Sequence, residues 1–342
     1  MKKRAYIKGI ESFLPIQKLT NEMLSKEYPD WNVQKIFDKT GISTRAIADK
    51  NECVSDLAVA SAEKLFAKGK CSKDEIDFLI LCTQSPDYLL PTTACIVQDR
   101  LGLPTRCGAF DFNLGCSGYV YGLSVVKGMI ETGIIGNALL ITSETYTKYL
   151  HPSDRSVRTI FGDGASATFI ASTESDEEYI GPFVFGTDGS GANELIVPAG
   201  GLRKPISLET TLEETSDGII YRSPQNLFMN GAEIFNFTIR TVPATIRHLL
   251  EKSAKTIEDI DVFIFHQANK FMLESLRKKI KIPEEKFCIN NEHYGNTVSS
   301  TIPMALEIER LNGNVKKGDV VMLVGFGVGL SWAATLVKIH DF

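Results

Sequence analysis

Residues 108–133 read GAFDFNLGCSGYVYGLSVVKGMIETG, and the rest of the chain is best interpreted outward from this stretch. It begins with an apolar run, residues 109–114, that is bounded by glycine and indicates a strand. After a turn of small residues at 115–118, apolar residues recur every three or four positions. This spacing predicts an amphipathic helix that ends at Gly133. Cys116 therefore lies where a strand gives way to a helix.

This position of Cys116 predicts a reactive thiol. The first backbone N–H groups of a helix have no partner within it and carry partial positive charge. Such groups lower the pKa of a cysteine, and they can bind the oxyanion that forms when a thiolate attacks a thioester. We therefore expect a lowered pKa for Cys116, with Gly115 and Gly118 leaving room for a substrate. The alternative is that Cys116 is a small buried hydrophobe.

Length and composition describe an ordinary globular protein. The 342 residues, 43% hydrophobic and 23% charged, are enough for one large or two medium domains. A formal net charge of -5 gives no reason to expect nucleic-acid binding. The seven cysteines include no C-x-x-C pair, which argues against a metal site or a disulfide framework and favours a reducing compartment. With no signal peptide and no apolar run long enough for a membrane span, we expect a cytoplasmic protein without a membrane partner.

Strands and helices alternate in the first part of the chain, and a similar order returns in the last part. The alternation predicts an α/β layered fold. We divide the chain into an N-terminal half (1–172), a Gly- and Pro-rich segment of connecting strands and loops (173–226) and a C-terminal half (227–342). The expected strands are residues 4–10, 76–83, 109–114, 137–143, 165–171, 261–265, 320–324 and 330–339. The expected helices are residues 55–68, 93–101, 119–133, 231–252, 269–280 and 301–312.

A glycine-rich run at residues 325–329 raises the question of a nucleotide cofactor. A dinucleotide fingerprint has to follow a strand and open a helix, but the residues after this run indicate a strand. We therefore expect the glycines to bring backbone close to a reacting centre instead.

Two polar residues stand at element boundaries in the C-terminal half. His266 follows an apolar strand and precedes a polar turn, a position from which a side chain can point into a cleft. Asn296 lies in a tight turn before the helix at residue 301. Either residue alone has a structural explanation, as a satisfied polar side chain at a strand end or as a turn former. With Cys116 they supply what thiol-based acyl transfer needs, an acyl carrier and two groups that bind a developing negative oxygen.

These stretches together resemble one family. NLGCSG, HQAN and YGNTVSSTIPMAL, in this order, are similar to the active-site motifs of β-ketoacyl-acyl carrier protein synthase III enzymes, which belong to the thiolase superfamily. KTGISTR at 39–45, IFGDGASATFI at 160–170, MNGAEIF at 229–235 and GFGVGLSWAATLV at 325–337 also resemble that family. The similarity implies a thiolase-like five-layered α-β-α-β-α fold built from two related halves, and a homodimer.

The resemblance also implies a reaction. Cys116 would take an acyl group from a thioester, and malonyl-acyl carrier protein would lose CO₂. The resulting carbanion would attack the acyl group and give 3-oxoacyl-acyl carrier protein, in fatty-acid initiation or a specialised pathway. His266 and Asn296 would stabilise the enolate oxygen, and the backbone N–H groups of Cys116 and Val328 would form a second oxyanion site. No cofactor is expected besides the substrates.

Binding residues follow from matched positions in the family's motifs. Leu90 matches a residue that reaches across the dimer to the partner's acyl pocket, and Arg155 matches an arginine near the nucleotide of CoA. Lys35 and Lys39 stand where the family has an aromatic residue, which stacks on adenine, and an arginine. An ammonium group cannot stack as an indole does, so acyl-CoA and acyl-carrier protein both stay open as donors. The remaining substrate-binding positions are Gly231 and Gly327.

A carrier protein is usually acidic, so a basic patch is expected near the cavity that it serves. The candidates follow HQAN directly, although the same residues would also suit a solvated helix face. They are Lys270, Arg277, Lys278, Lys279 and Lys281. Two alternatives to the condensing enzyme remain: an acyltransferase of the same fold that serves another nucleophile, and a noncatalytic scaffold that binds carrier protein.

Overall fold

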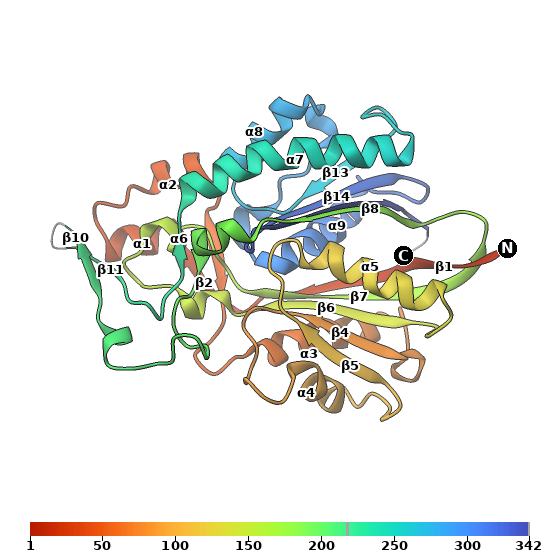
Figure 1. The fold of residues 1–342 in the computed structure, drawn as a ribbon, viewed down its shortest axis with the longest axis horizontal. Coiled ribbons are helices and arrows are strands. Elements are labelled where there is room, and N and C mark those ends of the chain that lie inside the picture. The colour runs from red at the N-terminus through yellow and green to blue at the C-terminus, as the bar shows by residue number, and fades with distance from the viewer. Residues whose placement is uncertain (217–218, 341–342) are drawn as a thin grey trace.

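The computed structural model describes residues 1–216 and 219–340, and two main β-sheets lie at its centre (Figure 1). The first sheet has the strand order β1-β7-β6-β4-β5. β4 runs parallel to β5 and β6, whereas β6–β7 and β7–β1 are antiparallel pairs. β6 is buried along its whole length, as its continuous apolar run predicts. The bounds are β1 (Lys2–Phe13), β4 (Phe78–Cys82), β5 (Gly108–Phe112), β6 (Ala138–Glu144) and β7 (Gly164–Ser175).

The second sheet has the order β13-β14-β15-β8, with β13 parallel to β14 and the other pairs antiparallel. Its strands are β8 (Ile180–Thr187), β13 (Val262–Phe265), β14 (Val320–Gly327) and β15 (Ser331–Lys338). β8 falls within residues 173–226, so that segment contributes a strand of the second sheet in addition to connections. Its glycine and proline content obscured the strand. Pro182 is tolerated because β8 is an edge strand.

Helices complete five layers (Figure 1). α3 (Val54–Ala67) and α4 (Thr93–Arg100) cover the outer face of the first sheet, and α7 (Gly231–Ser253) and α8 (Lys270–Ile280) cover that of the second. α5 (Gly118–Glu131) and α9 (Thr301–Leu311) pack between the sheets. Three hydrophobic clusters fill the spaces between these layers. The predicted α-β-α-β-α fold is confirmed.

The two halves share one order of elements. The first half runs β4, α4, β5, α5, β6, β7, and the second runs β13, α8, α9, β14, β15. In the second half a parallel bridge between Phe263 and Phe287 takes the place of the β4–β5 pair. β14 and β15 pair antiparallel, as β6 and β7 do. The central helices α5 and α9 are therefore equivalent elements.

Shorter elements lie at one end of the layers, on the left in Figure 1. They are β2 (Gln17–Thr20), α1 (Asn21–Glu27), α2 (Val33–Thr40), β3 (Thr44–Ile47), α6 (Arg155–Arg158), β9 (Leu195–Ile196), β10 (Glu214–Ser216), β11 (Ile219–Arg222) and β12 (Phe228–Met229). Among the described residues, no helix combines the length and apolar character that a bilayer crossing requires.

Candidate active site

Cys116 lies in the turn between β5 and α5, directly before Ser117, the N-cap of α5. The residue is only 5% exposed, and it lines a cavity of about 860 Å³. His266 and Asn296 line the same cavity. Three residues from distant parts of the chain thus meet at one site, and the two halves both contribute to it.

The glycines near Cys116 are required by packing. A Cβ added to Gly118 would lie 2.3 Å from the sulfur of Cys82, and one added to Gly115 would lie 2.5 Å from a side chain of the loop after β4. These glycines therefore let the turn pack on β4, and the expectation that they leave room for a substrate is wrong. Gly327 is the glycine that faces Cys116, because a Cβ there would lie 2.8 Å from the sulfur of Cys116. The glycine-rich run leads from β14 to β15, as predicted, and brings backbone close to Cys116.

The pKa of Cys116 is raised, contrary to the expectation from its position. Burial raises this pKa to about 12, and the carboxyl of Glu144 acts in the same direction. The backbone N–H groups of Cys116 itself and of Val328 act on the thiol and lower the pKa by less. Enclosure by the second half outweighs the helix start, because burial disfavours the charged form of a thiol. Cys116 is therefore a neutral thiol near pH 7, and the two N–H groups are those predicted for the oxyanion site.

His266 continues β13 by one residue, since its backbone N–H donates to the carbonyl of Val324 at 2.8 Å. Its imidazole Nδ1 lies 2.7 Å from Oγ1 of Thr301. Burial lowers the pKa of His266 to about 3, and the carbonyl of Val298 opposes this shift. The imidazole is therefore uncharged near pH 7.

Gln267 ties the end of β13 to the segment that leads to Asn296. Its Nε2 donates to the carbonyl of Phe265 at 2.7 Å, and its Oε1 accepts from the N–H of Asn290 at 2.8 Å. The side chain is fully buried. Gln267 thereby fixes the spacing between the His266 and Asn296 segments.

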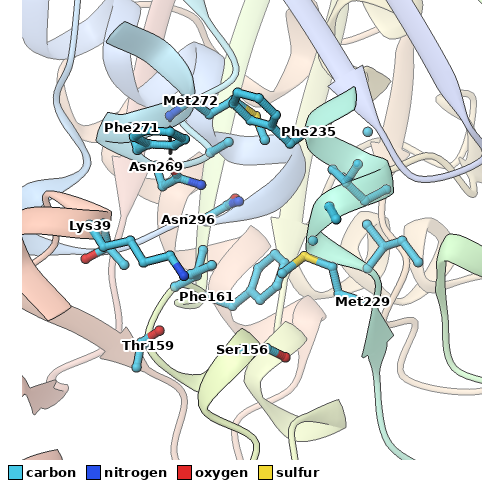
Figure 2. Close-up of a pocket in the computed structure, with 18 of the residues that line it drawn as sticks. Lys39, Ser156, Thr159, Phe161, Met229, Phe235, Asn269, Phe271, Met272 and Asn296 are labelled. Atoms are coloured by element: carbon cyan, nitrogen blue, oxygen red, sulfur yellow. Dashed lines mark hydrogen bonds between the residues drawn. The ribbon is translucent and has the colours of Figure 1, made fainter. Parts of the chain in front are cut away.

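Asn296 is held by its backbone and by its side chain. Its N–H donates to the carbonyl of Ile160 at 2.9 Å, and its own carbonyl accepts from Gly162 at 3.0 Å. Its Oδ1 accepts from the N–H of Val298 at 2.9 Å, and its Nδ2 lies 3.4 Å from Nε2 of His266. The amide is thus oriented with its NH₂ group toward the imidazole. Figure 2 shows Asn296 at the centre of the cavity wall.

Glu144 is a buried carboxyl at the end of β6 that the sequence did not single out, although it directly follows the predicted strand 137–143. It accepts hydrogen bonds from the backbone N–H of Gln84 and, at 2.9 Å each, from the hydroxyls of Ser85 and Ser299. Burial raises the pKa of Glu144 to about 8 despite these donors. At pH 7 the carboxyl is mostly protonated, so it is not a fixed negative charge beside Cys116.

The cavity has a charged side and an aromatic side at its mouth. Lys35, Lys39 and Arg155 are exposed residues of α2 and α6 that line it. On the opposite side the rings of Phe235 and Phe271 stack with centroids 5.5 Å apart (Figure 2). Gly231 also lines the cavity. The deeper walls are mainly apolar and include Ile160, Phe161, Leu195, Met229, Ile234 and Phe326.

The remaining predicted binding residues lie outside the cavity. Leu90 is 86% exposed and does not line the cavity of its own chain. Among the predicted basic patch, Lys270 is adjacent to residues that line the mouth. Arg277 forms ion pairs with Glu274 and Glu284, at 2.8 and 3.3 Å. Two further members of the patch, Lys278 and Lys281, are exposed at the far end of α8 from the mouth.

Comparison with known proteins places this geometry in a family. The models for 3-oxoacyl-[acyl-carrier-protein] synthase III and for its C-terminal region match residues 110–189 and 250–339. The β-ketoacyl-[acyl-carrier-protein] synthase III of Caldanaerobacter subterraneus subsp. tengcongensis is 38% identical over 334 residues, which cover 98% of this chain and 97% of that protein. The enzyme of the same name from Clostridium perfringens strain ATCC 13124 is 40% identical over 338 residues, covering 98% and 100%.

Solved structures agree with the sequence relatives. A crystal structure of a 3-oxoacyl-(acyl-carrier-protein) synthase III shares 55% identity and a TM-score of 0.96, covering 98% of this chain and 100% of that chain. The 3-oxoacyl-(acyl-carrier protein) synthase of Burkholderia xenovorans LB400 shares 35% identity and a TM-score of 0.90, covering 99% and 95%. Because the similarity extends over nearly the whole length, this chain belongs to the 3-oxoacyl-[acyl-carrier-protein] synthase III family of the thiolase superfamily.

Proposed function

We propose that this chain condenses an acyl group bound to Cys116 with malonyl-acyl carrier protein, releasing CO₂ and 3-oxoacyl-acyl carrier protein. The chain is a condensing enzyme of the β-ketoacyl synthase III type, as its family membership establishes. The observation that supports the residue roles most strongly is the meeting of Cys116, His266 and Asn296 in one cavity. The cavity's mainly apolar depth suits an acyl chain.

Acylation starts from a neutral thiol and therefore needs a base. His266 is uncharged, and its Nε2 faces Asn296 in the cavity. In the proposed step, Nε2 takes the thiol proton as the sulfur of Cys116 attacks the thioester carbonyl. The N–H groups of Cys116 and Val328 bind the oxyanion. The donor's thiolate then leaves and receives the proton from His266. General-base catalysis of this kind contributes ~10²–10⁴ in rate.

Condensation begins when the malonyl group loses CO₂ and its thioester becomes an enolate. The amide NH₂ of Asn296 and a protonated Nε2 of His266 stabilise the enolate oxygen. The carbanion attacks the acyl carbon, the carbon–sulfur bond breaks, and the thiolate of Cys116 takes a proton. A donor that acts on charge formed in the transition state is worth ~10²–10³ in rate.

The mouth of the cavity suits a phosphate-bearing arm. Lys35, Lys39 and Arg155 place three cations there. Both CoA and acyl carrier protein present their thioester on a phosphopantetheine arm, so the cations support either donor. We propose acyl carrier protein as the partner in condensation.

We also propose a homodimer. Its support is an exposed apolar segment, Tyr88, Leu89 and Leu90, with exposed fractions of 62, 83 and 86%. Contiguous exposed apolar side chains of this kind mark interaction surfaces. The segment follows the loop in which the backbone N–H of Gln84 donates to Glu144.

The experiment is to incubate the protein with acyl-CoA or acyl-carrier protein and to weigh the intact chain and its peptides. We expect an acyl adduct on Cys116, and we expect malonyl-acyl carrier protein to discharge it with release of CO₂ and 3-oxoacyl product. Lack of any adduct would favour a noncatalytic scaffold. An adduct that is discharged by another nucleophile, without CO₂, would favour the alternative acyltransferase.

A further inference from the structure

The hydroxyl of Thr301 has two neighbours that constrain where its proton lies. Its Oγ1 is 3.0 Å from the carbonyl oxygen of Val298 and 2.7 Å from Nδ1 of His266. All three groups are buried. A carbonyl oxygen can only accept, and a hydroxyl has one proton to donate. The hydroxyl therefore donates to the carbonyl of Val298, and its oxygen accepts a hydrogen bond from the N–H at Nδ1 of His266.

This assignment leaves the other ring nitrogen without a proton. In a neutral imidazole one nitrogen donates and the other accepts, so Nε2 of His266 is the acceptor. Asn296 agrees with this, because its Nδ2 lies 3.4 Å from Nε2 and can only donate. The amide is kept in that orientation by the N–H of Val298, which donates to its Oδ1 at 2.9 Å.

Val298 holds the two side chains that face the two ring nitrogens of His266. Its carbonyl receives the hydroxyl of Thr301, and its N–H fixes Asn296. It does so with a φ of 55°, in the left-handed region that a β-branched residue seldom adopts. Such a conformation costs energy and persists where the surroundings determine it, most often at functional sites. The unusual backbone and the closed set of hydrogen bonds are thus parts of one arrangement.

We propose that Thr301 is a positioning residue that holds the imidazole proton of His266 on Nδ1, so that Nε2 exchanges a proton with Cys116 in both half-reactions. The proposal rests on the proposed function and adds a residue to it. In acylation, Nε2 takes the thiol proton and returns it to the leaving thiolate, so no proton is gained or lost.

Condensation consumes one proton, because the malonyl carboxylate leaves as CO₂ and Cys116 must end as a thiol. That proton comes from water and binds Nε2, where it forms the hydrogen bond to the enolate oxygen. It then moves to the sulfur of Cys116 as the carbon–sulfur bond breaks. The proton on Nδ1 stays hydrogen-bonded to Oγ1 of Thr301 throughout. The ring of His266 therefore neither turns nor changes tautomer between the two steps.

The test compares Thr301→Val, which keeps the branched shape but lacks the hydroxyl, with Thr301→Ser, which keeps the hydroxyl. The matched control is Ser300→Ala. Ser300 is an equally buried neighbour whose hydroxyl contacts Thr142 and the carbonyl of Gly164, away from the imidazole. We expect Thr301→Val to slow acylation of Cys116 by ~10–100-fold, part of the range for general-base catalysis. Thr301→Ser and Ser300→Ala should stay within a few-fold of the wild type.

Nitrogen-15 NMR of histidine-labelled protein supplies a readout that a structural role would not move. The His266 signals, assigned with a His266→Gln variant, should show the proton on Nδ1 in the wild type and in Thr301→Ser, and a changed tautomer in Thr301→Val. A wild-type proton on Nε2, or an unchanged tautomer and rate in folded Thr301→Val, would overturn the proposal. The spectrum needs no substrate. A wild type that fails to acylate Cys116 would therefore count against the proposed function without changing the tautomer result.

Discussion

The helices α5 and α9 occupy equivalent places in the two halves, yet their first turns are built from different chemistry. The turn before α5 consists of glycine, cysteine and serine, and its packing brings backbone N–H groups to the sulfur of Cys116. The start of α9, residues 298–301, instead carries three hydroxyls. The three hydroxyls have different hydrogen-bond partners. That of Ser299 donates to Glu144, and that of Ser300 to Thr142. The hydroxyl of Thr301 donates to the carbonyl of Val298 and contacts the imidazole of His266.

The two helix starts therefore place different groups at the cavity. The first places the thiol of Cys116 among backbone N–H donors, and the second orients the side chains of His266 and Asn296. Burial keeps both Cys116 and His266 neutral near pH 7. Charge therefore forms only during the reaction, where prepositioned donors are worth most.

Removing the nucleophile should have the largest effect. Cys116→Ala should abolish acylation and reduce condensation by at least ~10⁴-fold, as expected for a residue whose catalytic group acts as a unit with others. Cys82→Ala is the matched control, since Cys82 is also buried and packs against the same turn. The intact mass of each variant after incubation with the acyl donor shows whether an acyl adduct has formed. An adduct on Cys116→Ala would break the assignment.

Two glycine substitutions distinguish crowding of the Cys116 sulfur from a change within helix α5. Gly327→Ala puts a methyl group 2.8 Å from the nucleophilic sulfur, so we expect acylation to slow on the order of 10²-fold, as for a misplacement of about 1 Å. Gly128→Ala, within α5, meets no atom within 4 Å. It should raise stability by about 0.5–1 kcal/mol without slowing acylation. Single-turnover rates and thermal melts test the pair, and equal rates for the two variants would contradict the account.

Charge reversal at the mouth should affect binding more than chemistry. Lys39→Glu should raise KM for acyl-CoA about tenfold, equivalent to ~1.4 kcal/mol, with little change in kcat. The effect should shrink at high salt, because exposed charges are screened. Lys278→Glu, at the far end of α8, is the control for acyl-CoA. With carrier-bound substrates, a larger effect of Lys278→Glu than of Lys39→Glu would favour the basic patch predicted from the sequence.

Glu144 should affect stability and not the binding of substrate, and its effect should be visible as a pH dependence of the free energy of unfolding. Its pKa rises from 4.5 to about 8 on folding, so the folded state holds a proton that the unfolded state releases between these values. Stability from this group is present at low pH and is lost as pH rises through the window, by at most ~1.4 kcal/mol per pH unit. Glu144→Gln should therefore lose less stability between pH 6 and about 8.5 than the wild type. Denaturant unfolding at several pH values measures this. The same pH dependence of the free energy of unfolding in both proteins would contradict the raised pKa of Glu144.

Much of the fold could be predicted because apolar runs and turn residues indicate the strands, the helices and their ends. The buried strands β4 and β6 and the long helix α7 follow their sequence patterns closely. Strands were expected within residues 173–226, but the position of β8 in the second sheet was not, because Gly181 and Pro182 interrupt its pattern and only its edge position permits them. The motifs also led to Cys116, His266 and Asn296, since each stands beside a turn.

The direction of the Cys116 pKa could not be predicted from its neighbours in sequence. The shift depends on how fully the second half encloses the thiol, and Gly327 and Val328 contribute to that enclosure from far along the chain. Thr301 was equally hidden among several hydroxyl residues. Which of them meets His266 depends on the left-handed backbone of Val298, a conformation that a β-branched residue argues against.

The most direct test of the central claim is to separate the two half-reactions in Asn296→Ala. Asn296 should act only on the enolate oxygen, so rapid-quench mass spectrometry should find acylation of Cys116 within a few-fold of the wild type. Discharge of the acyl-enzyme by malonyl-acyl carrier protein, and the CO₂ released with it, should slow by ~10²–10³-fold. Equal slowing of both half-reactions, or normal discharge, would contradict the claim that Asn296 acts on the enolate oxygen and not in acylation.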